Sequence, residues 1–271
     1  MKWNRFLLYL VLALGVLMAV YPFVWMVGTA FKTLPEANTA SLRLFPDTWQ
    51  WGNVAATFRA APFGRYFLNS LLVSMIVCVS VCLTSLMAGY AFARLRFRGR
   101  GVLFVITLCS MMVPFEAVFV PNFVLITRLG WYNSYFALIV PWCANAFSIF
   151  LMRQAFLSLP QDYYDAARVD GCGHLRFLFR IGIPLVKPML VTVALFAFLG
   201  SYNALLWPLI VTADESMRVV QVGLTAFYTD AGTRLNLLMC ASSVVILPTV
   251  LLYLLAQRYY VESALGSGIK G

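Results

Sequence analysis

The sequence predicts an all-α, polytopic membrane protein with about six transmembrane helices. Hydrophobic residues make up 62% of its 271 residues and charged residues 11%, against about 25% charged in soluble domains. The mean hydropathy is +0.84. Six apolar segments are near or above the roughly 20 residues that a helix needs to cross the bilayer core. We expect a single transmembrane domain over residues 1–271, with spans near 6–31, 67–93, 102–127, 129–152, 188–213 and 235–257.

The first apolar segment follows Lys2 and Arg5, as the apolar core of a secretory signal does. Such a core covers only about 7–15 residues. Here the run from Phe6 to Phe31 contains no charged residue. We therefore interpret it as an uncleaved first span.

The basic residues predict the orientation, because cytoplasmic loops are enriched in Lys and Arg. With the N-terminus inside, 13 basic residues lie in inner segments and 7 in outer ones. The short 94–100 loop, with four arginines, is the firmest anchor. Both termini are predicted to be cytoplasmic, with the long 32–65 segment outside.

Composition and single residues also exclude several classes. The net charge of +10 is explained by topology, and with no nucleic-acid motif we expect no nucleic-acid partner. Five of six cysteines lie in apolar runs, so they form no disulfide framework. Cys78 and Cys82 have the spacing of a metal pair but no partner histidine. His174, the one histidine, is expected to be a solvated loop residue. We predict no metal site and no catalytic site.

The segment 159–188 is a second long connection, on the predicted cytoplasmic side. Pro160 suits a helix start, and Asp162 and Asp165 favour a helix N-terminus through the dipole. Gly171 can adopt the left-handed conformation that ends a helix. A second helix should place Leu175, Leu178, Phe179 and Gly182 on one face and Arg176 and Arg180 on another, and end at Pro184 and Pro188. The segment therefore predicts a helix–turn–helix outside the bilayer.

The same segment resembles the "EAA" coupling motif of ABC importer permeases. Asp165-Ala166-Ala167, Asp170-Gly171 and Ile183-Pro184 stand at the positions of that motif. Asp165 replaces the usual Glu, which shortens the acidic arm, and Cys172 replaces the usual Ala. The resemblance implies that the following residues couple the chain to an ATPase: Asp165, Ala166, Ala167, Asp170, Gly171, Arg176, Ile183 and Pro184.

Other stretches extend the resemblance over nearly the whole chain, toward carbohydrate permeases of the maltose and glycerol-phosphate type. The matching stretches are 62–70, 88–97, 114–130, 203–209 and the tail 266–271, which ends in Ile269-Lys270-Gly271. The tail reads equally well as a docking segment or as a frayed terminus.

The resemblance implies an importer in a prokaryotic inner membrane, with a second permease, two ATPase subunits and an extracytoplasmic solute-binding protein. Two different permeases in a heterodimer are expected. This chain has no G-x-x-x-x-G-K-[ST] phosphate loop, so ATP and Mg would be bound by the partner ATPase and no cofactor by this chain. Closure of the ATPase pair would then switch the permeases between inward- and outward-facing states.

Some polar residues inside the spans are candidates for the solute pathway. Glu116, between Pro114 and Pro121, is the one acid in the six spans, and it is either a pathway residue or a group that stabilises a broken helix. Tyr202, Asn203 and Trp207 combine hydrogen-bonding groups with aromatic faces, which suits a sugar. They could equally pack against the other permease. Asn145 is a weaker candidate of the same kind.

Two other classes remain as alternatives. An ion-gradient-driven secondary transporter usually carries several ionisable groups near the membrane midplane and internal repeats. This sequence has one such acid and no evident repeat. A membrane scaffold without transport function is the third class.

Overall fold

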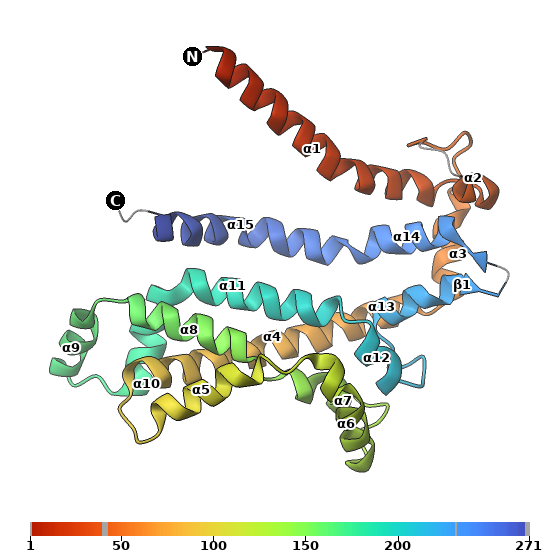
Figure 1. Ribbon diagram of the computed structural model, residues 1–271. Helices are drawn as coiled ribbons and strands as arrows, with labels where there is room; N and C mark the ends of the chain where they lie inside the picture. The colour runs from red at the N-terminus through yellow and green to blue at the C-terminus, as the bar shows by residue number, and fades with distance from the viewer. Residues whose placement is uncertain (1, 40–42, 231, 269–271) are drawn as a thin grey trace. The chain divides into compact units, whose positions relative to one another are not determined.

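In the computed structural model the chain is mainly α-helical (Figure 1). The structure describes residues 2–39, 43–230 and 232–268, with side chains from residue 5 to residue 257 in these ranges. The chain divides into two compact units, residues 1–67 with 220–248 and residues 68–219 with 249–271. The single domain over 1–271 stays a prediction. The end of the tail, Ile269-Lys270-Gly271, lies outside the described residues.

The first unit combines the N-terminal helix with a later hairpin and helix. Its α14 packs against α1 and α3, and β1 pairs antiparallel with β2 so that Tyr228 lies opposite Thr233. The elements of this unit are α1 (Lys2–Ala30), α2 (Leu34–Asn38), α3 (Gly52–Ala60), the start of α4 (Phe63–Arg94), α13 (Val220–Gly223), η3 (Leu224–Phe227), β1 (Tyr228–Thr229), β2 (Gly232–Thr233) and α14 (Leu235–Val245).

Amide side chains and aromatic rings hold this unit together. The Asn53 amide donates to the carbonyls of Ala30 and Lys32, at 2.9 Å each, which ties α3 to the end of α1. The rings of Phe63 and Phe227 stack at 5.6 Å. A side chain at Gly223 would stand 2.4 Å from the Tyr66 ring, so only glycine allows this close approach.

The second unit holds most of the remaining helices. Within it α8 packs against α11 and against α5. Its elements are most of α4, α5 (Arg100–Ser110), α6 (Phe115–Arg128), α7 (Tyr135–Ile139), η1 (Val140–Trp142), α8 (Ala146–Ser158), α9 (Gln161–Val169), α10 (His174–Phe177), η2 (Leu178–Gly182), α11 (Ile183–Tyr202), α12 (Leu206–Val211) and most of α15 (Leu247–Gly268).

The membrane prediction is confirmed, with corrections to individual spans. Four helical stretches in the described chain are long and apolar enough to cross a membrane, and the number rises to six if each of two bent pairs is one span. The four stretches are Arg5–Ala30, Phe63–Arg94, His174–Tyr202 and Leu235–Gln257. The bent pairs are Arg100–Ser110 with Phe115–Arg128 and Tyr135–Trp142 with Ala146–Ser158.

The third and fourth predicted spans are not single straight helices. The third is bent by 96°, and Pro114 caps the new helix, since its ring prevents α5 from continuing. The fourth was predicted from residue 129, but its helices cover Tyr135–Ser158 and bend by 40°. The chain turns tightly between the two bent pairs, where Gly130 and Asn133 have left-handed backbones, at φ +71° and +56°.

The helix at the fifth predicted span, 188–213, has other bounds than the predicted span. The helix runs from His174 to Tyr202, and α12 is a separate short helix. The prediction that Pro184 and Pro188 end the preceding helix is wrong. A π-helical turn at Leu178–Gly182, in which the N–H of Ile183 donates to the carbonyl of Leu178, precedes Pro184. This wider turn changes the local hydrogen bonding, so the helix continues through both prolines.

Candidate functional site

The predicted helix–turn–helix is formed by α9 and α10. The Cys172 N–H donates to the Ala167 carbonyl at 2.9 Å and the Gly171 N–H to the Arg168 carbonyl at 3.0 Å, with Gly171 at φ +70°. This is a Schellman end, in which a glycine in the left-handed region satisfies the last carbonyls of a helix. The predicted helix end at Gly171 is confirmed.

An aromatic core anchors this element to the end of α4. The Tyr164 ring meets the Phe177 ring edge-on at 5.3 Å, and Phe177 stacks on Tyr90 at 5.9 Å. The Nδ1 atom of His174 lies 3.0 Å from the Tyr90 hydroxyl and 3.2 Å from the Tyr164 hydroxyl. His174 is exposed, as expected of a solvated residue, and in addition its ring joins α4, α9 and α10.

The opposite surface of the element is exposed and partly apolar. Val169 is 88% exposed, Leu175 66% and Tyr163 50%, an unusual set for a loop surface. The predicted apolar face of the second helix is buried only in part: Leu178 and Gly182 are buried, whereas Leu175 and Phe179 are exposed. Of the predicted coupling residues, Ala167 is buried, Ile183 is half-buried, and the others are exposed: Asp165, Ala166, Asp170, Gly171, Arg176 and Pro184.

Arg94, which the sequence indicated only as a topology signal, contacts both α8 and α9. One guanidinium nitrogen donates to the carbonyls of Phe156 at 2.8 Å and Leu159 at 2.7 Å, and another donates to the side-chain carbonyl of Gln161. The Gln161 amide in turn donates to Asp165 Oδ1 at 3.1 Å. The position of Arg94 at the end of a predicted span was the one available signal for this role.

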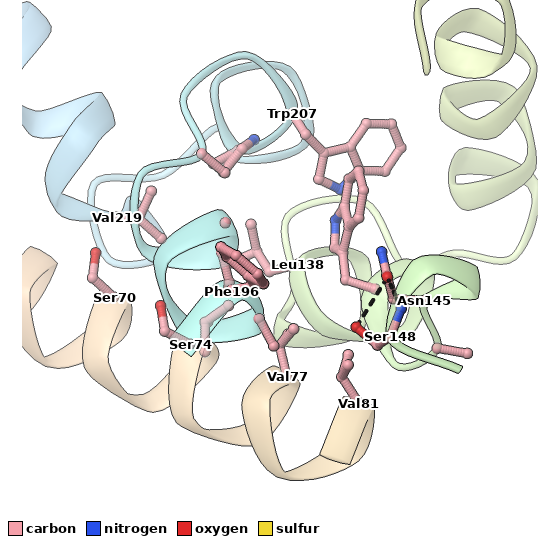
Figure 2. A pocket seen from close by; sticks show the side chains of 18 of the residues that line it. Ser70, Ser74, Val77, Val81, Leu138, Asn145, Ser148, Phe196, Trp207 and Val219 are labelled. Carbon is pink, nitrogen blue, oxygen red and sulfur yellow. Dashed lines mark hydrogen bonds between the residues drawn. The ribbon is translucent and has the colours of Figure 1, made fainter. Parts of the chain in front are cut away.

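A cavity of about 290 Å³ lies within the second unit, between α4, the α7–α8 region, α11 and α12 (Figure 2). Aromatic rings line it, including Trp142, Phe196 and Trp207, together with hydroxyl and amide groups. Ser74 is 1% exposed, and its hydroxyl has no hydrogen-bond partner among the described residues. None of the described residues that line the cavity is charged.

Two predicted pathway residues line this cavity. Asn145 caps α8, and its side-chain oxygen accepts the Ser148 N–H at 2.8 Å and the Ser148 hydroxyl at 3.0 Å (Figure 2). Trp207 is 3% exposed, and its indole N–H donates to the Ala137 carbonyl at 2.9 Å. The indole N–H is therefore engaged in packing, whereas the ring remains part of the cavity wall.

The other three predicted pathway residues lie apart from the described cavity lining. Tyr202 is 1% exposed and stacks on Phe198 at 5.5 Å. Asn203 is exposed and caps the end of α11. Glu116 is exposed in the first turn of α6, immediately after the 96° bend. The structure thus separates a cluster that the sequence suggested as one unit.

Membrane-spanning helices with an exposed helix–turn–helix indicate a membrane subunit of a transporter. Comparison with known proteins identifies the family to which this subunit belongs. Residues 81–262 match the family described as binding-protein-dependent transport system inner membrane component, and the chain belongs to this family. It is a permease subunit of an ABC importer, a transport component rather than an enzyme, and works with a partner permease, an ATPase and a binding protein.

Curated relatives match nearly the whole chain. The chain is 34% identical to the arabinooligosaccharides transport system permease protein AraQ of Halalkalibacterium halodurans, over 93% of this chain and 92% of that protein. It is 30% identical to the sn-glycerol-3-phosphate transport system permease protein UgpE of Yersinia pestis bv. Antiqua, over 96% and 95%.

A solved structure has the same fold. It is a chain of a bacterial ABC transporter involved in the import of the acidic polysaccharide alginate. The TM-score is 0.84, with 22% sequence identity, over 96% of this chain and 97% of that one.

Proposed function

We propose that this permease forms half of the pathway for a neutral sugar, oligosaccharide or related polyol, and pairs with a second, different permease. The observation that carries the solute class is the cavity, which offers aromatic faces, hydroxyls and an amide but no charged side chain among the residues described. Sugars bind through stacking and hydroxyl hydrogen bonds, whereas a phosphate ligand is usually held by Arg or Lys. The N-terminus of α8 borders the cavity, but the side chain of Asn145 already caps it.

Five residues are proposed for the solute pathway, with different support. Asn145 and Trp207 are supported by their place at the cavity. Glu116 and Asn203 are supported by their exposure near broken helices, and contact with the other permease is the competing role for both. Tyr202 is the weakest, since its side chain is buried against Phe198.

Uptake by the complete importer tests the solute class. Labelled arabinobiose, maltose and sn-glycerol 3-phosphate are offered in separate assays, and unlabelled sn-glycerol 3-phosphate is added as competitor to the two sugar assays. We expect uptake of at least one neutral sugar, without inhibition by glycerol phosphate. Uptake of glycerol phosphate with exclusion of neutral sugars would contradict the neutral-solute proposal.

We further propose that α9 and α10 lie in the cytoplasm and dock onto the ATPase, with both chain termini on the same side. The support is the exposed surface of Tyr163, Val169 and Leu175 on a rigidly anchored element, flanked by Asp165 and Arg168. The shortened acidic arm of Asp165 already accepts a hydrogen bond from Gln161. We therefore expect apolar contacts to contribute more to docking than an ion pair from Asp165.

Substitution at the tip of this surface tests docking. Val169→Asp places a charge where we expect an apolar contact, and burial of an unpaired charge is strongly unfavourable. The purified complex should therefore lose its ATPase subunits. Arg98→Gln, in a different exposed segment, is the matched control and should retain them. Full retention of the ATPase in Val169→Asp would contradict the docking proposal.

A further inference from the structure

One guanidinium joins three helices where the helix–turn–helix meets the spans. We propose that Arg94 is a positioning residue that fixes the α8–α9 elbow to the end of α4. A displacement of α9 by the ATPase is then transmitted to α4 as a rigid-body movement. This inference rests on the proposed docking of α9 and α10 onto the ATPase.

The first part of the clamp is at the end of α8. The Arg94 guanidinium donates to the carbonyls of Phe156 and Leu159, at 2.8 and 2.7 Å. The last carbonyls of a helix lack intrahelical donors and carry partial negative charge. A planar guanidinium satisfies two of them at once and keeps its charge, which a lysine ammonium with its compact charge does less well.

The second part of the clamp reaches α9. Arg94 donates to the Gln161 side-chain carbonyl, and the Gln161 amide donates to Asp165 Oδ1 at 3.1 Å. The charge at the end of α4 is thus linked through one amide to the carboxylate of the motif residue on α9. The same arginine therefore holds both sides of the elbow, at Leu159 before it and Gln161 after it.

The contact between α4 and α8 does not depend on Arg94 alone. A side chain at Gly89 would stand 2.7 Å from the Met152 Cβ, so the two backbones are in close contact there. The Arg153 Nε donates to the Phe92 carbonyl at 3.3 Å, and its guanidinium lies 4.1 Å from the Phe104 ring centroid. Loss of Arg94 should therefore leave α4 packed on α8. Among the described residues, it should leave α9 attached to α4 only through the rings of Tyr164, Phe177 and Tyr90 and through His174, so that the α9 side of the elbow detaches more often.

Distances between two spin labels on the complete importer test the clamp. The labels are placed at Asp162→Cys on α9 and Leu83→Cys on α4, both exposed positions, after replacement of the native cysteines. Pulsed electron paramagnetic resonance is recorded without nucleotide and after trapping with ATP and vanadate. The variants are Arg94→Gln and Arg94→Lys, and Arg98→Gln is the control with the same change of charge.

We expect the parent complex and Arg98→Gln to give one narrow distance distribution that is the same in both states. In Arg94→Gln a second, detached population should rise roughly tenfold, because hydrogen bonds to a charged group shift an equilibrium by at least about that factor. Arg94→Lys should be intermediate. If Arg94→Gln weakens assembly of the complex, the distances in Arg94→Lys test the clamp instead: a larger detached population than in the parent supports it, and a distribution equal to the parent contradicts it.

Two results would overturn the inference. One is an Arg94→Gln distribution equal to the parent in both states, and the other is a parent distance that changes between the states. Failure of the docking proposal is a separate observation, because the Val169→Asp complex would then retain its ATPase subunits. The nucleotide-free distributions would still show whether Arg94 holds the elbow.

Discussion

At the scale of single residues, two glycines in the α9–α10 turn differ in backbone conformation. Gly171 has φ +70°, whereas Gly173 has φ −71°, and a Cβ on either would meet no atom within 4 Å. A side chain in the left-handed region costs roughly 1–2 kcal/mol because its Cβ crowds the backbone. The two sites therefore differ in the backbone strain that a side chain would cause, and not in the space available for it.

We accordingly predict that Gly171→Ala destabilises the helix–turn–helix by about 1 kcal/mol and Gly173→Ala much less. Hydrogen exchange of the amides of residues 161–177 measures this directly in the purified complex. Faster exchange in Gly171→Ala alone is the expected result. Equal exchange in the two variants would show that the turn does not depend on a left-handed backbone.

Trp207 gives a second prediction at this scale. Its indole N–H is hydrogen-bonded to the Ala137 carbonyl in a buried position, and its ring belongs to a cluster with Phe115, Phe119 and Trp142. Trp207→Phe removes the donor and leaves the buried carbonyl unsatisfied, which costs about 1–3 kcal/mol. The thermal midpoint of the complex should fall. An unchanged midpoint would mean that the bond adds no net stability.

At the scale of elements, the crossing of α4 and α8 depends on Gly89. Its packing against Met152 and Arg153 leaves no room for a Cβ, while Gly101 in α5 has open space around it. We predict that Gly89→Ala destabilises the complex, although alanine favours a helix by about 1 kcal/mol over glycine. Gly101→Ala should be neutral or stabilising. Thermal unfolding of both variants measures the difference, and equal shifts would contradict this crossing.

Element positions were predictable from the sequence to the extent that hydropathy determined them. The first, second and sixth spans agree closely with helices, and Gly171 ends α9 as expected. The course of the helix at the fifth span was not predictable. Proline usually ends a helix, but after the π turn at Leu178–Gly182 the helix continues through Pro184. The Arg94 contacts were not predictable either, since they join residues that are more than 60 positions apart.

At the scale of the whole molecule, the family assignment predicts ATP-driven transport. Uptake by membrane vesicles should stop when ATP is removed from the cytoplasmic side and should continue when a protonophore collapses the ion gradient. Replacement of the partner ATPase's phosphate-loop lysine should have the same effect as ATP removal. Uptake that follows the gradient and ignores ATP would instead favour the secondary-transporter alternative.

The solute pathway was the least predictable feature of the whole molecule. Asn145 and Trp207 come together only because α8 and α12 border the same cavity, and Ser74 contributes from α4. Ser74 was not predicted, because a serine in an apolar helix usually bonds back to its own helix. Its hydroxyl has no partner among the described residues, and that observation required the folded structure.

The central claim is that the α9–α10 element faces the cytoplasm and is covered by an ATPase. Labelling of Val169→Cys with a membrane-impermeant maleimide tests this most directly, with Trp51→Cys as the marker of the opposite side and the native cysteines replaced. We predict that Val169→Cys is labelled only in inside-out vesicles stripped of ATPase, and is protected when the ATPase is added back. Labelling of Val169→Cys in right-side-out vesicles, or no protection by the ATPase, would contradict the account.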